Sequence, residues 1–148
     1  MKVLVIGSGA REHAIVDGLL ADDDVTEVVV APGNAGIAAL VPVAWIDPLD
    51  PAAVADLAVA ERADLVVVGP EAPLVAGVAD AVRERGIACF GPSAQAARLE
   101  GSKAFAKQVM AEAGVPTALA HICTTVSEVA HALDEFGPPY VVKDDGLA

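Results

Sequence analysis

Aromatic residues and basic residues are scarce in this chain of 148 residues, and both shortages narrow what the protein can be. Only 3% of the residues are aromatic while 55% are hydrophobic, which predicts an aliphatic core of the kind that parallel strands and Ala-rich helices build. Nine Lys and Arg residues stand against 21 Asp and Glu, and the net charge of −12 repels polyanions. We therefore expect no nucleic acid and no anionic membrane surface as a partner.

Long apolar runs and paired cysteines are also missing. No run reaches the ~18 apolar residues that a membrane span needs, and the start of the chain is too short and too strand-like for a signal peptide. Cys89 and Cys123 stand singly, without the spacing of metal sites or redox motifs, and both are predicted to be reduced core residues. These features lead us to expect a cytoplasmic protein.

Short apolar runs alternate with helical stretches along the first hundred residues or so, which is typical of βαβ units. The predicted strands cover residues 2–6, 27–31, 41–45, 64–68 and 87–90, and the predicted helices cover residues 11–20, 51–62 and 73–85. The fold class is therefore predicted to be α/β, a doubly wound, mostly parallel sheet with helices on both faces. This domain is predicted to span residues 1–101.

A second, incomplete domain is predicted over residues 102–148. Ser102 is expected to be the N-cap of a helix over residues 102–113, and a helix over residues 127–136 precedes a Gly-Pro-Pro turn and a strand over residues 140–143. These elements are too few to bury a core of their own. The rest of an α+β domain is therefore expected outside this chain.

The first predicted strand runs into a glycine-containing turn at the start of a helix. Backbone N–H groups at such a turn attract an anion, although a tight turn without a ligand is the alternative. Glu12 stands where a dinucleotide-binding turn has its third glycine, and no acidic residue ends the second strand. The turn is thus predicted to bind a single phosphate rather than NAD or a flavin dinucleotide.

Arg11 and Glu12 follow this turn and carry opposite charges. A ligand with an anionic group for the turn and Arg11, and an amine for Glu12, would satisfy both side chains. We therefore expect a phosphorylated amine as the ligand. The alternative for Glu12 is compensation of the helix dipole in a first helical turn.

Two further loops are expected at the same crevice, because ligands of open parallel sheets lie beyond the carboxyl ends of the strands. Asn34 lies in a compact turn between glycines and can both donate and accept hydrogen bonds. Glu71 follows a wholly apolar strand with no opposite charge nearby in the sequence, which makes it the stronger candidate for a substrate amine. A structural turn at Asn34 and a helix-terminal acid at Glu71 are the alternatives.

Six segments in this order together resemble the phosphoribosylamine–glycine ligases, or glycinamide ribonucleotide synthetases. These segments are GSGAREHA at residues 7–14, PGNAG at 32–36, GPEAPL at 69–74, FGP at 90–92, LEGSK at 99–103 and KDDGLA at 143–148. Each is a weak signal alone, but the set spans the whole chain in register. The resemblance implies a pre-ATP-grasp substrate domain followed by the start of an ATP-grasp domain.

The resemblance also implies the reaction. ATP phosphorylates the carboxylate of glycine, and the amine of 5-phosphoribosylamine attacks the acyl phosphate to form an amide, giving glycinamide ribonucleotide, ADP and phosphate in purine biosynthesis. The cofactors implied are ATP and Mg²⁺ or Mn²⁺, whose acidic ligands in the family lie further along the protein than residue 148. We expect this chain alone to be inactive and the full-length protein to be a monomer.

The site residues implied by the resemblance fall into two groups. Gly9, Ala10, Arg11, Glu12, Asn34 and Glu71 are the substrate-binding candidates, and Lys103 and Lys143 are the ATP-binding candidates. For both lysines, ordinary surface positions are the alternative. Ala10 stands where many relatives carry Gly, and Asp144 stands where the family generally has Ala, so an extra carboxylate lies next to Lys143.

Two other functions stay open at this point. One is another ATP-grasp ligase, such as a formate-dependent transformylase or a carboxylase subunit, which begins with a similar domain. The other is an isolated sugar-phosphate-binding module without catalytic activity.

Overall fold

The computed structural model describes residues 1–146. The chain divides into two compact units, one of residues 1–97 and one that begins at Arg98. Leu147 and Ala148, the end of the KDDGLA segment, lie outside the described residues. The first unit contains the sheet, and the described part of the second unit contains helices and loops but no strand.

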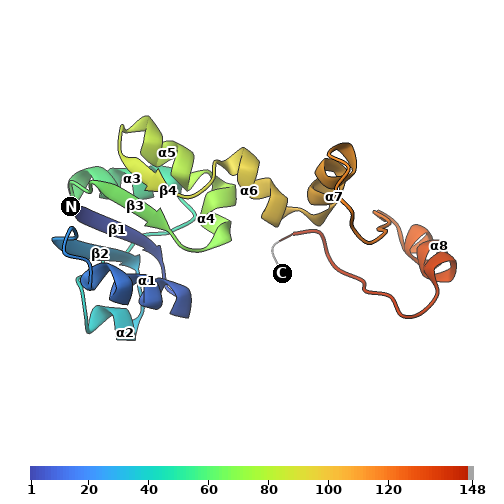
Figure 1. The fold of residues 1–148 in the computed structure, drawn as a ribbon, viewed down its shortest axis with the longest axis horizontal. Helices are drawn as coiled ribbons and strands as arrows, with labels where there is room; N and C mark the ends of the chain where they lie inside the picture. Colours follow the sequence, from blue (N-terminus) through green and yellow to red (C-terminus); the bar gives the residue numbers. More distant parts are fainter. Residues whose placement is uncertain (147–148) are drawn as a thin grey trace. The chain divides into compact units, whose positions relative to one another are not determined.

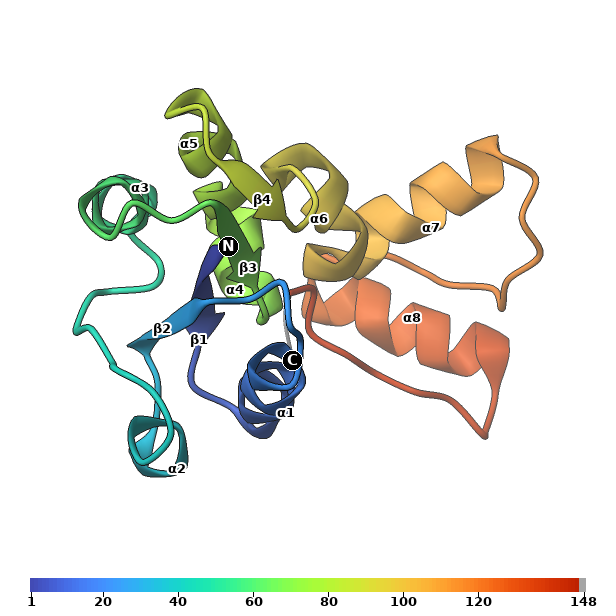
Figure 2. The same ribbon diagram turned by 60° about the vertical axis from the view of Figure 1, so that its left-hand side comes forward.

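The first unit is built on a sheet of four parallel strands in the order β2-β1-β3-β4 (Figures 1 and 2). The strands are β1 (Lys2–Gly7), β2 (Glu27–Pro32), β3 (Leu65–Val68) and β4 (Ala88–Phe90). Strand β1 lies in the middle, pairing with β2 on one side and β3 on the other. Four of the five predicted strands are thereby confirmed.

Helices cover both faces of this sheet, because successive side chains of each strand point to opposite faces. Leu4 and Ile6 of β1 enter one core and Val3 and Val5 enter the other. The first core is closed mainly by α3 (Pro51–Ala60) and α5 (Val78–Glu84), and the second by α1 (Ala10–Leu20) and α2 (Ala35–Ala38) (Figure 1). The predicted α/β fold class is confirmed.

The predicted strand over residues 41–45 is wrong. Only one parallel bridge forms there, between Val43 and Val30, with the Ala44 amide donating to the Val30 carbonyl over 2.9 Å. The Trp45 side chain is 88% exposed. With no apolar surface to cover that residue, the pairing does not extend into a strand.

The predicted helix over residues 73–85 consists of two helices, α4 (Glu71–Ala76) and α5. Gly77 separates them with φ of +98°, in the left-handed region that glycine adopts without strain. Leu74 and Val78 on either side of the break are both buried in the core. The break therefore lets two short helices turn separate apolar faces inward.

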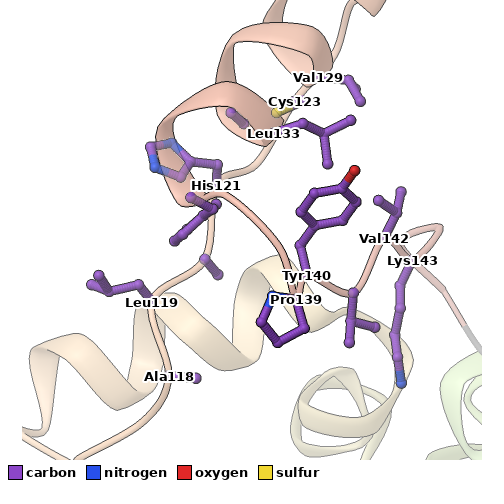
Figure 3. Close-up of a pocket in the computed structure, with 14 residues that line it drawn as sticks. Ala118, Leu119, His121, Cys123, Val129, Leu133, Pro139, Tyr140, Val142 and Lys143 are labelled. Carbon is purple, nitrogen blue, oxygen red and sulfur yellow. The ribbon is translucent and has the colours of Figure 1, made fainter.

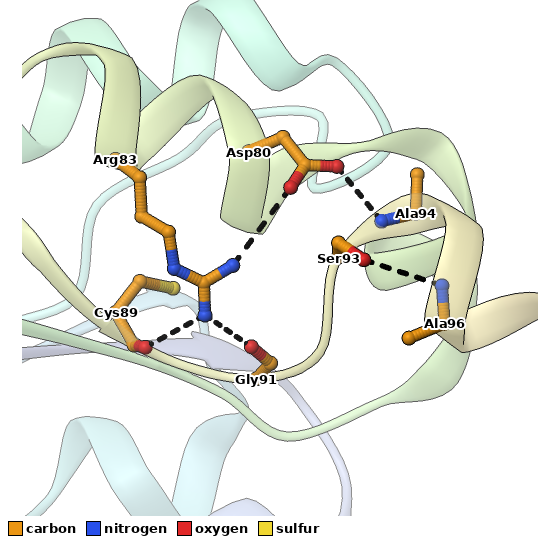
Figure 4. Close-up of polar contacts among 7 residues, drawn as sticks. All are labelled: Asp80, Arg83, Cys89, Gly91, Ser93, Ala94 and Ala96. Atoms are coloured by element: carbon orange, nitrogen blue, oxygen red, sulfur yellow. Dashed lines mark hydrogen bonds and ion pairs between the residues drawn. The ribbon is translucent and has the colours of Figure 1, made fainter.

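The loop after β4 is held by two charged side chains of α5, as Figure 4 shows. The Arg83 guanidinium donates to the Cys89 and Gly91 carbonyls, and the Asp80 carboxylate accepts from the Ala94 amide over 2.8 Å. Ala94 is the first residue of α6 (Ala94–Gly101). Asp80 thus stabilises the start of α6 from a neighbouring helix.

The second unit contains α7 (Lys103–Glu112) and α8 (Val126–Phe136). Ser102 caps α7 as predicted, its hydroxyl accepting from the Phe105 amide over 3.1 Å. The predicted strand over residues 140–143 is wrong, since no regular secondary structure is found there. No other strand occurs in the described part of this unit, so that segment has no partner for a backbone ladder.

Both cysteines are free thiols and half-buried rather than wholly in the core. Burial raises the pKa of the Cys89 thiol above its usual value, with the nearby Arg83 charge opposing that change. This Cys89 environment favours the neutral, unreactive thiol.

Candidate functional site

The carboxyl edge of the sheet has a topological switch point between β1 and β3. The chain leaves β1 toward β2 on one side and later returns to β3 on the other, so the loops that follow β1 and β3 diverge at this edge. Such a switch point is where open α/β sheets bind ligands. The loops after β1, β2 and β3 are the ones from which the sequence predicted the substrate-binding residues.

Glu12 is buried beneath this edge, with only 4% of its surface exposed. Its carboxylate accepts from the Gly9 amide over 2.6 Å, as the side chain of a capping box does at the start of α1. A Cβ on Gly7 would lie 2.5 Å from Glu12 Cγ, and a Cβ on Gly69 would overlap the same carboxylate. The two glycines therefore make the space that Glu12 fills.

Arg11 joins the loops after β1 and β3. Its guanidinium donates to the Gly69 carbonyl over 2.8 Å and to Glu71 Oε1 over 2.9 Å. The Glu71 carboxylate raises the pKa of Arg11, while the pKa of Glu71 is lowered by its own backbone amide and then by the Arg11 guanidinium. The side chains of Arg11 and Glu71 are 61% and 43% exposed, so a ligand can reach both.

Asn34 joins the loops after β1 and β2. Its Nδ2 donates to the Ser8 carbonyl over 2.8 Å, and its Oδ1 accepts from the Ile37 amide over 3.0 Å as the N-cap of α2. Asn34 thus fills the structural role that the sequence left open, and it also fixes the loop that carries the candidate anion site.

The start of α1 offers backbone N–H donors to an anion. The Gly9 amide already donates to Glu12, so it is engaged within the protein. The Ala10 and Arg11 amides belong to the first turn of α1, where N–H groups have no carbonyl acceptor within the helix. Together with the Arg11 guanidinium and the positive end of the helix dipole, these amides are groups that can attract an anion.

The ATP-binding candidates lie in the second unit and are described separately from this crevice. Lys103 is the first residue of α7. Lys143 is exposed and lines a cavity of about 450 Å³, formed by one face of α8 together with residues 118–121 and 139–143 (Figure 3). In the described part of the chain, Lys143 makes no ion pair with Asp144, whose carboxylate instead accepts from the Asp145 amide over 3.1 Å.

Two further properties concern the described residues as a whole. Residues 1–146 contain no group of three or more His, Cys, Asp or Glu side chains placed to hold a metal ion. Within the same range, every helix is too short or too polar to span a bilayer.

Comparison with known proteins identifies relatives over the whole chain. Residues 1–100 match the family described as "Phosphoribosylglycinamide synthetase, N domain", and residues 101–148 match "Phosphoribosylglycinamide synthetase, ATP-grasp (A) domain". The chain is 68% identical to a phosphoribosylamine–glycine ligase of Streptomyces coelicolor and 61% identical to one of Leifsonia xyli, both over its full length. It spans only 36% of the length of each of these relatives.

Solved structures agree with this assignment. The phosphoribosylamine–glycine ligase of Thermotoga maritima is 32% identical with a TM-score of 0.74, over 99% of this chain and 34% of the other. The biotin carboxylase domain of the Hydrogenobacter thermophilus 2-oxoglutarate carboxylase is 27% identical with a TM-score of 0.69, over 93% of this chain and 33% of the other. On the family match and these identities, the chain belongs to the phosphoribosylglycinamide synthetase family.

Proposed function

We propose that the complete gene product containing this chain ligates glycine to 5-phosphoribosylamine at the expense of ATP. The observation that carries this proposal is the joining of Arg11, Glu71 and the α1 N-terminus at one crevice, in a chain of this family. An anion site next to an exposed carboxylate is complementary to a sugar that carries both a phosphate and an amine. The relatives named phosphoribosylamine–glycine ligase support the same substrate.

The first unit is proposed to bind 5-phosphoribosylamine. The phosphate lies against the Ala10 and Arg11 amides and the Arg11 guanidinium, and the amine faces Glu71. Gly9 and Asn34 shape the turn, through their bonds to Glu12 and to the Ser8 carbonyl. Glu12 is buried behind the turn and is proposed as a second carboxylate near the amine.

The second unit is proposed to contribute Lys103 and Lys143 to binding the phosphates of ATP. An ammonium group neutralises phosphate charge, which the reaction requires because an anionic carboxylate must approach a triphosphate. An oxygen of glycine then bonds to the γ-phosphorus as the bond to ADP breaks. The sugar amine next attacks the carbonyl carbon and expels phosphate, and the amide forms as the nitrogen loses a proton.

The reaction is proposed to use Mg²⁺ or Mn²⁺ with ATP, bound by residues outside this chain. We also propose that the complete protein is a monomer in the cytoplasm. Size-exclusion chromatography with light scattering tests the monomer, and replacing one metal by the other in the activity assay tests the choice of ion.

The test of the proposed function is ADP release by the complete gene product with ATP, glycine and 5-phosphoribosylamine. We expect release only when both glycine and the sugar amine are present, with one glycinamide ribonucleotide formed per ADP. Release that depends on formate or bicarbonate in place of glycine contradicts the proposal and favours another ATP-grasp ligase. Binding of the sugar phosphate without any ADP release favours a binding module.

A further inference from the structure

The start of α7 is bound by a carboxylate that lies far away in the sequence. Asp145 Oδ2 accepts from the Ser102 hydroxyl over 2.9 Å, and Asp145 Oδ1 accepts from the Ala104 amide over 3.1 Å. The pKa of Asp145 lies below its usual value, first because of the Ala104 amide, then the Ser102 hydroxyl and, more weakly, the Lys103 amide. The carboxylate therefore sits against the first turn of α7, where the helix dipole favours a negative charge.

These bonds join the two segments that carry the ATP-binding candidates. Lys103 lies between Ser102 and Ala104, the two residues that donate to Asp145. Lys143 lies two residues before Asp145, within about 7 Å of backbone even if the chain is fully extended. One carboxylate thus holds the backbone of the Lys143 segment against the backbone of Lys103.

In the described part of the chain, only the hydrogen bonds of Asp145 join the Lys143 segment to α7. Within residues 1–146, the two bonds of Asp145 are the only hydrogen bonds from residues 140–146 to any other segment. The bond between Asp144 and Asp145 is local to the segment. Loss of Asp145 would release the Lys143 segment from α7 while leaving the Ser102 hydroxyl free to cap Phe105.

We propose that Asp145 is a positioning residue for nucleotide binding, which fixes the spacing of Lys103 and Lys143 by joining their segments at the start of α7. This inference rests on the proposed role of the two lysines. Asp145 and Ser102 accept hydrogen bonds from the Ala104 and Phe105 amides in the first turn of α7. The nucleotide phosphates are therefore bound by the ammonium groups of the two lysines and not by these amides.

The test compares Asp145→Ala with Asp144→Ala in the complete gene product. Both variants remove one carboxylate from adjacent positions, but only the first removes the bonds to α7. We expect Asp145→Ala to raise the Kd and the KM for ATP about tenfold, as loss of charged hydrogen bonds does, and to change the KM for glycine and for 5-phosphoribosylamine less than about twofold. Asp144→Ala should change all these constants less than about twofold.

Further variants separate positioning from a general loss of structure. Asp145→Asn retains one acceptor and is expected to restore part of the ATP affinity. Ser102→Ala should raise the Kd for ATP by a smaller factor, and Ser102→Ala combined with Asp145→Ala should be no weaker than Asp145→Ala alone. A fall in kcat alone, with every KM unchanged, indicates a smaller folded fraction and overturns the proposal.

The outcomes also distinguish this inference from the proposed function. Calorimetric titration with ATP in the presence of Mg²⁺ reports on Asp145 even if the complete protein ligates nothing. An unchanged Kd in Asp145→Ala, or equal changes in Asp145→Ala and Asp144→Ala, overturns the positioning role while the ligase proposal stands. Should Asp145→Ala not fold, an unchanged Kd in Ser102→Ala has the same meaning.

Discussion

A methyl group added at Gly69 should displace the carboxylate of Glu12 and destabilise the first unit. The Gly69 backbone lies outside the left-handed region, so alanine is not strained there for backbone reasons. Its Cβ would overlap the buried Glu12 carboxylate. The Gly69→Ala variant therefore isolates one steric contact.

The magnitude follows from what Glu12 loses. Moving the carboxylate breaks its bond to the Gly9 amide, and a hydrogen bond to a charged group contributes about 1.5–3 kcal/mol. Overpacking of a tight site adds about 1–3 kcal/mol. The lower limits together give about 2.5 kcal/mol, which for a unit of this size lowers the unfolding midpoint by roughly 10 °C or more.

Thermal unfolding of the chain, followed by far-ultraviolet circular dichroism, measures this effect. Glu12→Ala alone should cost about 1.5–3 kcal/mol, because it removes the same bond to the Gly9 amide. Adding Gly69→Ala to Glu12→Ala should cost nothing further, since the methyl group enters the vacated space. Strictly additive losses in the double variant would refute the contact between Glu12 and Gly69.

Three other predictions concern the crevice and the helices. Arg11→Ala should weaken binding of ribose 5-phosphate by about 10- to 100-fold, measured by calorimetry on the chain, with unchanged circular dichroism. The pKa of Glu71 lies below its usual value of 4.5 because of its own backbone amide and then the Arg11 guanidinium. These two bonds therefore stabilise the chain above pH 4.5 and are lost as the pH falls through the lowered pKa. Carbon-13 NMR titration should show the Glu71 pKa rising toward its usual value in Arg11→Ala, and an unchanged titration would contradict the pairing. Gly77→Ala should lower the free energy of unfolding by about 1–2 kcal/mol, because the backbone of Gly77 is left-handed. Gly18→Ala should raise it by about 0.5–1 kcal/mol, because Gly18 lies within α1 and a methyl group there meets no other atom. Urea unfolding measures both.

The fold was predictable from the sequence where local patterns and tertiary packing agree. The strands are short apolar runs, and Asp50 with Pro51 marks the start of α3 as a side-chain cap followed by a first-turn proline. The prediction was wrong over residues 41–45, where the apolar pattern is right for a strand but no surface covers Trp45. It was also wrong at Gly77, because one glycine in a helical pattern does not reveal a left-handed break.

The candidate site was predictable in its members but not in its contacts. The turns after the strands located Arg11, Asn34 and Glu71 because parallel strands end at one edge of the sheet. The bond between Arg11 and Glu71 joins residues 60 positions apart, which no local pattern specifies. The burial of Glu12 had one signal, the spacing of three residues from Gly9 to a glutamate at a helix start.

Asp145 was missed for a different reason. The sequence drew attention to Asp144, which departs from the family pattern, whereas the contact with α7 comes from the residue beside it. A contact across 43 positions depends on how the chain after α8 returns to α7, and helix-capping rules describe only neighbours in sequence.

The bond from Asn34 ends on the main-chain oxygen of Ser8 rather than on its side chain. Mutation at position 8 can therefore change the exposed side chain at the crevice entrance without breaking the tether that orders the loop, whereas mutation of Asn34 removes the tether itself. Position 8 is therefore one place where a substitution can change ligand preference while the bond that orders the loop is kept, and we expect more variation there among homologues than at position 34.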